Sequence, residues 1–205
     1  MFSPSEIYAL RGRISKNMSK KRFLHTLGVE AMAVKLAQYC LPEDVAEISA
    51  AALLHDVAKE IPCDELLRII ENGGIVLDEA ERKMPAVWHS LAAPFVIKRD
   101  FPEFATDKVL SSVYNHTLGA PDMSVFDEII FVSDFIEETR AYAASRITRE
   151  KLLGSLTEGN FSSNISALHV AVLDEMDSTL AHLSDKGVPI SERTILTRNA
   201  FLTKI

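Results

Sequence analysis

The sequence predicts an all-α protein, and three observations carry this prediction. Apolar residues recur at helical spacing in successive stretches of the 205-residue chain. No stretch alternates apolar and polar residues as a half-buried strand does, and there is no internal repeat or low-complexity tract. Glycine is scarce, with eight residues. We therefore expect one helical domain over residues 1–205, with short connections between its helices.

Start and stop signals divide the first half of the chain into helices. Ser3 is a candidate cap for a lead-in helix, and Pro42 breaks the helix that follows it. The pair Gly73-Gly74 stops a short amphipathic helix. The helices expected here are 4–17, 20–40, 44–61, 64–72 and 86–98, with a helical turn at 78–84.

Similar signals organise the second half. Thr106 caps a helix that reaches His116, and Ser124 followed by Asp127 resembles a capping box. The helices expected here are 106–116, 124–145, 148–156 and 162–184, with a loop at 117–122 after the first of them. The tail after Gly187 is polar and is expected to be extended.

Composition restricts the class of partner and the compartment. The formal net charge of -7 argues against non-specific binding of a nucleic acid polymer, which relies on basic surface. The two cysteines have neither CxxC spacing nor a disulfide framework, which fits a reducing compartment. No stretch approaches the length of a membrane span, and the first residues form no apolar signal core. We expect a cytoplasmic protein without a membrane partner.

The stretch from Ala50 to Lys59 is the one around which the chain is organised. Uncharged residues run directly into the pair His55-Asp56. Burying an imidazole and a carboxylate is costly unless both are paired or bind metal. On a helix these two neighbours lie about 100° apart, so both can lean toward one point. Lys59 follows one helical turn after His55 and is expected on the same side.

Polar residues interrupt the apolar faces of several other expected helices. The full set, in chain order, is His25, His55, Asp56, His89, His116 and Asp134. A lone histidine on an apolar face is more often a hydrogen-bonded core residue, and Asp134 alone could cap a neighbouring helix or pair with Arg140. The ordered set is more specific, because several unrelated exceptions in the core would otherwise be needed. We therefore predict a metal site built from these residues.

The chemistry of these ligands limits the metal. Imidazole with carboxylate and no thiolate suits Fe, Mn, Co, Ni or Zn. The candidate ligands are too many for one catalytic ion with an open position. Two divalent transition-metal ions fit better, and Asp56 is the natural bridge between them. The residues alone leave the choice among Fe, Mn, Co, Ni and Zn open.

These residues resemble a known family. The order of His25, His55-Asp56 and Asp134 is similar to that of the HD-domain metal-dependent phosphohydrolase superfamily, and His89 and His116 match its dinuclear members. The resemblance is closer still to the YqeK family of bacterial symmetrical diadenosine tetraphosphate hydrolases. The matching stretches are residues 22–29, 51–60, 87–90, 115–124 and 130–137. The implied fold is a single HD-domain helical bundle, with a metal-binding core of about 20–145 and a looser C-terminal helical extension of about 146–205.

The resemblance implies a role for each matched residue. The implied ligands are His25, His55, Asp56 and Asp134 for one ion, and Asp56, His89 and His116 for the second. A water between the ions would attack a phosphorus of a dinucleoside polyphosphate, and the symmetrical cut of diadenosine tetraphosphate would release two ADP. Asp56 and Lys59 would be catalytic, and the residues expected to contact substrate are Lys59, Thr117, Gly119 and Arg140. The family usually follows Ile-Glu with Pro-Asn-Arg, whereas this chain has Glu138-Thr139-Arg140.

The expected substrate residues also have structural interpretations. Lys59 could be a solvated residue at a helix end, and Arg140 could form a surface ion pair with Glu137. The loop around Gly119 could be an ordinary helix connection. Outside the matched region we interpret His169 as a packed or partly exposed histidine, and one solvated face is expected at Asp174, Glu175 and Asp177.

Other functions remain open at this point. A nucleotidase or phosphodiesterase acting on another small nucleotide would use the same ligands, because a superfamily can keep its metals and change its pocket. A non-catalytic HD module that senses a nucleotide would be expected to have lost ligands. A helical interaction protein would hold no metal at all. The C-terminal helices offer apolar surface on which a homodimer could form.

Overall fold

The computed structural model describes residues 2–205, and these residues form α-helices and short 3-10 helices with no strand among them. The first part of the chain contains α1 (Pro4–Asn17), α2 (Lys20–Cys40), η1 (Pro42–Asp44), α3 (Val45–Leu54), α4 (Cys63–Asn72), α5 (Glu79–Arg82) and η2 (Pro85–Val87). The remainder contains α6 (Trp88–Asp100), η3 (Pro102–Phe104), α7 (Asp107–Asn115), α8 (Val125–Ile136), α9 (Ala143–Ser155), α10 (Phe161–Asp185) and α11 (Glu192–Phe201). The all-α prediction is confirmed.

Several predicted helix starts are present as hydrogen-bonded caps. The Ser3 side chain accepts a hydrogen bond from the Glu6 amide in a full capping box, and Ser124 forms the same box with Asp127. Thr106 caps α7 through the amide of Val109. These local signals depend only on neighbouring residues, which is why the sequence locates them.

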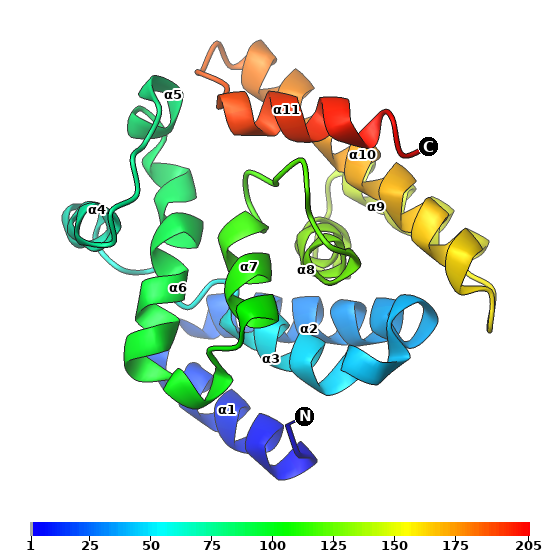
Figure 1. Ribbon diagram of the computed structural model, residues 1–205, viewed down its shortest axis with the longest axis horizontal. Helices are drawn as coiled ribbons and strands as arrows, with labels where there is room; N and C mark the ends of the chain where they lie inside the picture. Colours follow the sequence, from blue (N-terminus) through cyan, green and yellow to red (C-terminus); the bar gives the residue numbers. More distant parts are fainter. Residues whose placement is uncertain (1) are drawn as a thin grey trace.

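Helix α8 lies at the centre of the molecule. Figure 1 shows it nearly end-on, with α2 and α3 on one side and α10 and α11 on the other. Helix α2 packs against α3 and α8, and α7 packs against α3, α6 and α8. The segment of α3 from Ile48 to Leu54 is buried throughout. Five helices therefore meet within the core. Two of them, α3 and α7, contribute their ends, and α2, α6 and α8 contribute a face.

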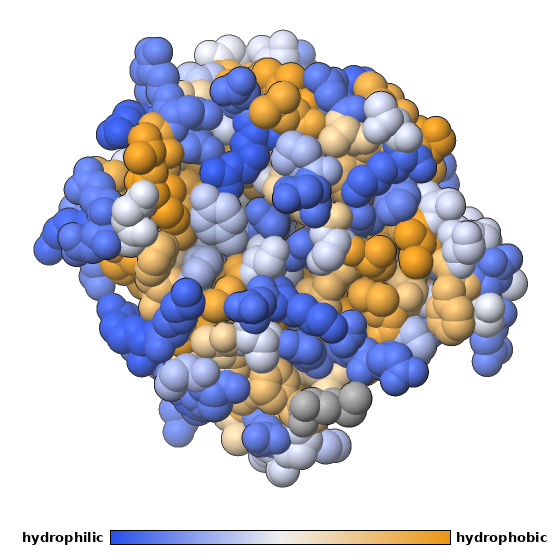
Figure 2. Space-filling view, in the orientation of Figure 1, coloured by the Kyte–Doolittle hydropathy of each residue, from blue (hydrophilic) through white to orange (hydrophobic). Residues whose placement is uncertain are grey.

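The C-terminal helices lie against this arrangement. Helix α10 packs on α2, α8, α9 and α11, and α9 packs on α8. On the face drawn in Figure 2, hydrophilic and hydrophobic side chains are interspersed. None of the described helices is both long and apolar enough to cross a membrane. The division into a core and an extension, and the homodimer, stay predictions.

Two predicted helices are wrong in length. The helix expected over 44–61 ends at Leu54, and the chain continues as turns in which the amides of Val57 and Lys59 bond to carbonyls three residues earlier. The helix expected over 124–145 ends at Ile136, because Glu137 adopts an extended conformation with ψ 156. The chain resumes helical structure only at α9. Both breaks fall beside predicted site residues.

The tail prediction is also wrong. Residues after Gly187 are not extended, because Ser191 caps the helix α11. Thr194, Thr197 and Phe201 form its buried face against the rest of the protein. Two threonines on a buried helix face give a weak apolar pattern, and this is why the helix is missed from the sequence.

Candidate active site

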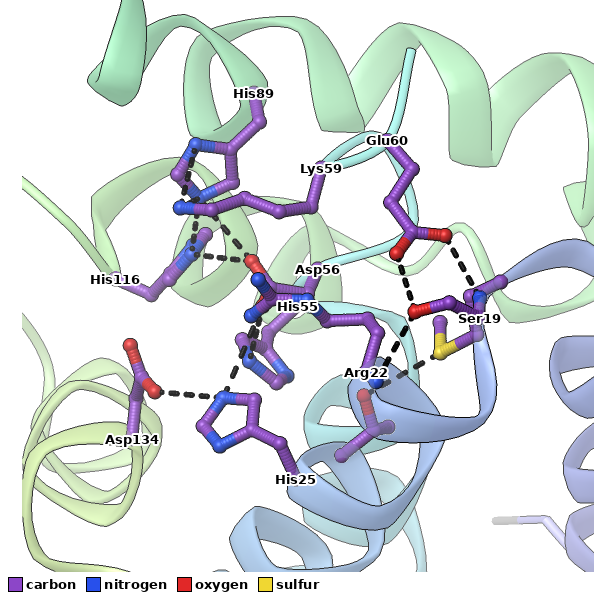
Figure 3. A network of polar contacts seen from close by, with 12 residues as sticks. Ser19, Arg22, His25, His55, Asp56, Lys59, Glu60, His89, His116 and Asp134 are labelled. Atoms are coloured by element: carbon purple, nitrogen blue, oxygen red, sulfur yellow. Dashed lines mark hydrogen bonds and ion pairs between the residues drawn. The ribbon is translucent and has the colours of Figure 1, made fainter. Parts of the chain in front are cut away.

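The polar residues singled out in the sequence converge on one point in the core. His25 comes from α2, His89 from the first turn of α6, and Asp134 from α8. His55 and Asp56 directly follow α3, and His116 directly follows α7. Figure 3 shows these side chains pointing toward one another. The structure divides them into two groups of potential metal donors, His25 with His55 and Asp134, and Asp56 with His89 and His116.

Asp56 lies between the two groups. Its Oδ1 atom is 3.2 Å from His89 Nε2 and 3.7 Å from His116 Nε2. Its Oδ2 atom is 3.5 Å from His55 Nε2 and 3.8 Å from His25 Nε2. Each carboxylate oxygen therefore faces one pair of imidazoles, which is the arrangement that a bridging ligand requires.

Three of the histidines are held in the same way. In each, Nδ1 lies at hydrogen-bond distance from the backbone carbonyl three residues earlier, and a carbonyl can only accept, so Nδ1 carries the proton. The pairs are His55 with Ala52 at 2.7 Å, His89 with Ala86 at 2.9 Å, and His116 with Val113 at 2.6 Å. The Nε2 atoms face Asp56 and are left as potential metal donors.

The donor atoms fit a cation. Nε2 of His25 and Nε2 of His55 are buried and make no hydrogen bond, although His25 Nε2 lies 3.0 Å from Asp134 Oδ1. A buried polar atom without a partner is rare in proteins, and a bound ion is one of its explanations. Imidazole nitrogen with carboxylate oxygen is a donor set suited to divalent transition metals.

Charge at the site favours the metal-binding forms of most of these groups. Burial works against ionisation of Asp56, but His55, His116 and His89 surround it and hold its pKa well below the usual range. Burial likewise opposes ionisation of Asp134, and its pKa is still lowered, chiefly by His25, His55 and Arg140. Burial lowers the pKa of His89 to about 4, so this imidazole is neutral at pH 7.

His55 differs from His89 because it faces both carboxylates. Burial would lower its pKa, but Asp56 and Asp134 outweigh that effect and raise it. The two carboxylates thus attract a proton to His55, and they would attract a divalent cation to the same place.

Three further side chains reach the cluster from outside it. Lys59 Nζ lies 3.1 Å from His89 Nε2, and burial lowers the pKa of this lysine. Thr117 Oγ1 lies 3.4 Å from the same nitrogen. Arg22 donates from Nη1 to Asp56 Oδ2 at 2.5 Å. Lys59 reaches the cluster through the turn after α3, and not along a continuous helix as expected.

The other two predicted substrate residues have different surroundings. Arg140 donates from Nε to the backbone carbonyl of Asp134 at 2.9 Å, and its Nη2 pairs with the Asp134 carboxylate. Its Nε is 3.9 Å from Glu137, so the main ion pair is with Asp134. Gly119 has a φ of +71°, and a Cβ there would meet Met176 and Thr197 at 2.6 and 2.7 Å. The structure gives Gly119 a packing reason, and its contact with substrate stays a prediction.

An open groove of about 980 Å³ adjoins the cluster. His25 lines both, and the basic residues of the groove are Lys20, Lys21, Arg22 and Arg140. Tyr142 also lines it and is exposed. Positive charge is therefore gathered beside the cluster, although the chain as a whole has a net charge of -7.

Sequence reasoning missed three residues near the cluster, of which Arg22 is half-buried and the other two are buried. Arg22 precedes His25 by one helical turn, and that spacing is the signal that could have identified it. Glu137 is fully buried and lies 3.1 Å from His25 Nδ1. Glu175 was expected on a solvated face but is buried, and burial raises its pKa well above the usual range, with Asp134 contributing. His169 is half-buried beside Glu128, as interpreted from the sequence.

Comparison with known proteins gives a consistent result. The model of the HD domain family matches residues 22–139, which include all six predicted ligands. A Bacillus subtilis protein named bis(5'-nucleosyl)-tetraphosphatase, symmetrical, is 27% identical over 194 residues, covering 91% of this chain and 92% of its own. A Staphylococcus aureus protein of the same name is 22% identical and covers 89% of this chain and 88% of its own.

A solved structure has the same fold over its whole length. It is the crystal structure of a predicted HD superfamily hydrolase involved in NAD metabolism from Clostridium acetobutylicum, with a TM-score of 0.82 and 28% sequence identity. The alignment covers 100% of both chains. The C-terminal helices of this chain therefore have counterparts in that protein.

Proposed function

This chain belongs to the HD domain family, and on that premise we propose that it cleaves diadenosine tetraphosphate symmetrically into two ADP. The observation that carries the proposal is the sharing of Asp56 between two groups of donors within one buried cluster. Relatives along nearly the full length of the chain are named for this reaction. The adjoining basic groove suits a long polyphosphate.

The residues would hold two divalent ions, with iron expected first. The proposed ligands are His25, His55, Asp56 and Asp134 for one ion, and Asp56, His89 and His116 for the other. When bound, the ions would supply Lewis acidity, which neutralises charge on the phosphate and makes a bridging water acidic enough to be the nucleophile. Fixed Nδ1 contacts hold the three backbone-bonded imidazoles in place before any ion arrives.

Cationic side chains then act on the substrate itself. Lys59 and Arg22 place positive charge beside His89 and Asp56, where a phosphoryl group must bind to react. Arg140 and the basic wall of the groove orient the polyphosphate chain on one side of the cluster. Thr117 offers a hydroxyl on the His89 side. ADP leaves as a stable anion, so a strong general acid is less important.

A product assay tests this function. Purified protein is incubated with diadenosine tetraphosphate, with and without Fe²⁺, Mn²⁺ or Co²⁺, and ADP, AMP and ATP are separated. ADP as the only product, with turnover lost in chelator, is the expected result. AMP with ATP would mean an asymmetric cut and would refute the proposal. His55→Ala should be inactive, while His182→Ala, which removes an exposed histidine, should keep full activity.

A second candidate is hydrolysis of another small nucleotide. The description of the Clostridium acetobutylicum protein as involved in NAD metabolism favours testing it. The same metals and ligands would serve, and only the groove would select the substrate. Absence of turnover with diadenosine tetraphosphate, together with turnover of a different nucleotide in a panel, would favour this candidate.

A further inference from the structure

The four histidines of the cluster are not held alike. His55 and His116 directly follow α3 and α7, where the last carbonyls of a helix lack amide partners and can accept from a ring Nδ1. His89 lies just after the 3-10 helix η2 and uses the carbonyl of Ala86. His25 lies inside α2, where carbonyls of the preceding turn are taken up by helical amides. Its Nδ1 needs a partner from elsewhere.

That partner is Glu137, which is distant in sequence and fully buried. Its Oε1 lies 3.1 Å from His25 Nδ1. The Thr139 amide donates to Oε2 at 2.6 Å, and the Thr139 hydroxyl donates to Oε1 at 2.5 Å. Arg149 donates to the carbonyls of Ile136 and Glu137 at 2.8 and 2.6 Å, which fixes the backbone. The Glu137 carboxylate thus accepts from three donors, which are His25 Nδ1 and the amide and hydroxyl of Thr139, and both of its oxygens are engaged.

The α2 helix leaves room for this carboxylate. Gly28 lies inside α2, where glycine is less stabilising than alanine. A Cβ at this position would lie 2.5 Å from Glu137 Oε2, and real Cβ contacts are not that short. By contrast, a Cβ at Gly12 in α1 would meet nothing within 4 Å. Glycine is therefore required at position 28 because the Glu137 carboxylate approaches the helix closely there, and not because the helix itself needs a glycine.

We propose that Glu137 is a positioning residue that holds His25 with Nδ1 protonated and Nε2 turned to the cluster, and that Gly28 gives it the space. The inference rests on the metal site of the proposed function. A carboxylate behind an imidazole fixes the ring and makes it a stronger ligand. Among the six predicted ligands, the only one that Glu137 contacts is His25, so its effect is confined to the group of His25, His55 and Asp134.

Two substitutions test this from opposite sides. Glu137→Gln replaces one acceptor oxygen by an NH₂ group, so one of the three donors loses its acceptor. Gly28→Ala keeps the carboxylate and displaces it. Each should lower the affinity of one of two Mn²⁺ or Co²⁺ sites by about 10–100-fold and leave the other unchanged, as measured by calorimetric titration of the metal-free full-length protein. Gly12→Ala should bind as the wild type does.

A double substitution separates positioning from general packing. Once His25 is removed, Glu137 has no ring to orient, so His25→Ala with Glu137→Gln should bind metal as His25→Ala alone does. Equal weakening of both metal sites, or no change in either, would overturn the inference. If the wild type binds no second ion, the dinuclear function fails first, and that result is separate from any difference between variants.

Nitrogen NMR of the metal-free protein gives a readout without metal or activity. The Nδ1 proton of His25, held by Glu137, should exchange slowly with water and give a sharp signal in the wild type and in Gly12→Ala. In Glu137→Gln and Gly28→Ala this proton should exchange faster, and its signal should shift or broaden. The same spectrum in all four proteins would refute the positioning role even if metal binding were never observed.

Discussion

Glu128 makes protein stability depend on pH in a way that can be calculated. It lies on α8 with 1% of its surface exposed, and burial raises its pKa to about 7 from 4.5. Lys204 Nζ is 3.3 Å from Oε1 and opposes that rise without cancelling it. His169 Nε2 is 3.4 Å from Oε2. Changing Glu128 to glutamine removes the titration and keeps the shape.

The sign follows from proton binding in the two states. With a folded pKa above the unfolded one, the folded protein binds more protons between the two values, so stability falls as pH rises toward 7. The separation between the two values sets a ceiling of about 3 kcal/mol, at 1.36 kcal/mol per pH unit. Between pH 5 and pH 8 the expected loss is about 2.5 kcal/mol.

Urea unfolding at half-unit pH steps from 5 to 8 measures this loss. The difference in unfolding free energy between Glu128→Gln and wild type should move in favour of the variant by about 2.5 kcal/mol across this range. Titrating groups that do not contact Glu128 act equally in both proteins and cancel. Glu150→Gln, which changes an exposed glutamate on α9, should follow the wild type. Parallel curves for Glu128→Gln and wild type would refute the reasoning.

Three other predictions concern the cluster and its surroundings. Asp56→Ala should abolish turnover and release metal while circular dichroism still reports most of the helix content; full activity would defeat the ligand assignment. Lys59→Ala should lower kcat on diadenosine tetraphosphate with metal content unchanged, because its ammonium group lies beside His89 and is no ligand; an unchanged rate would leave it a structural residue. Glu175→Gln should have an unfolding free energy within about 1 kcal/mol of wild type at pH 7, since burial raises the pKa of this carboxyl and so favours its neutral form, which an amide resembles; a larger loss in urea would mean that the ionised form is needed.

The sequence located the cluster because burial makes polar exceptions visible. His25, His55 and Asp134 each interrupt an apolar helix face, and such interruptions are costly unless the groups are paired. The caps at Ser3 and Ser124 were also predictable, because both partners lie within a few residues. Local hydrogen bonds and periodicity are properties of short segments, and short segments can be read from sequence.

The break after α8 shows where sequence reasoning ends. Residues 137–142 contain no proline or glycine that would stop a helix, and the expected helix ran on to 145. In the structure the Glu137 carboxylate accepts from Thr139, and Arg149 takes the last helical carbonyls. His25, from a distant helix, completes these contacts, and no local pattern in the sequence specifies them.

By itself the sequence determined the helical class, the helix caps and the six polar residues that occupy the core. It did not specify the contact of Arg22 with Asp56 or that of Glu137 with His25, and it gave the wrong exposure for Glu175. The tertiary structure decided these because each depends on how helices far apart in the chain pack around α8. Burial and charge at one residue are set by its neighbours in space, and only the packed fold specifies those neighbours.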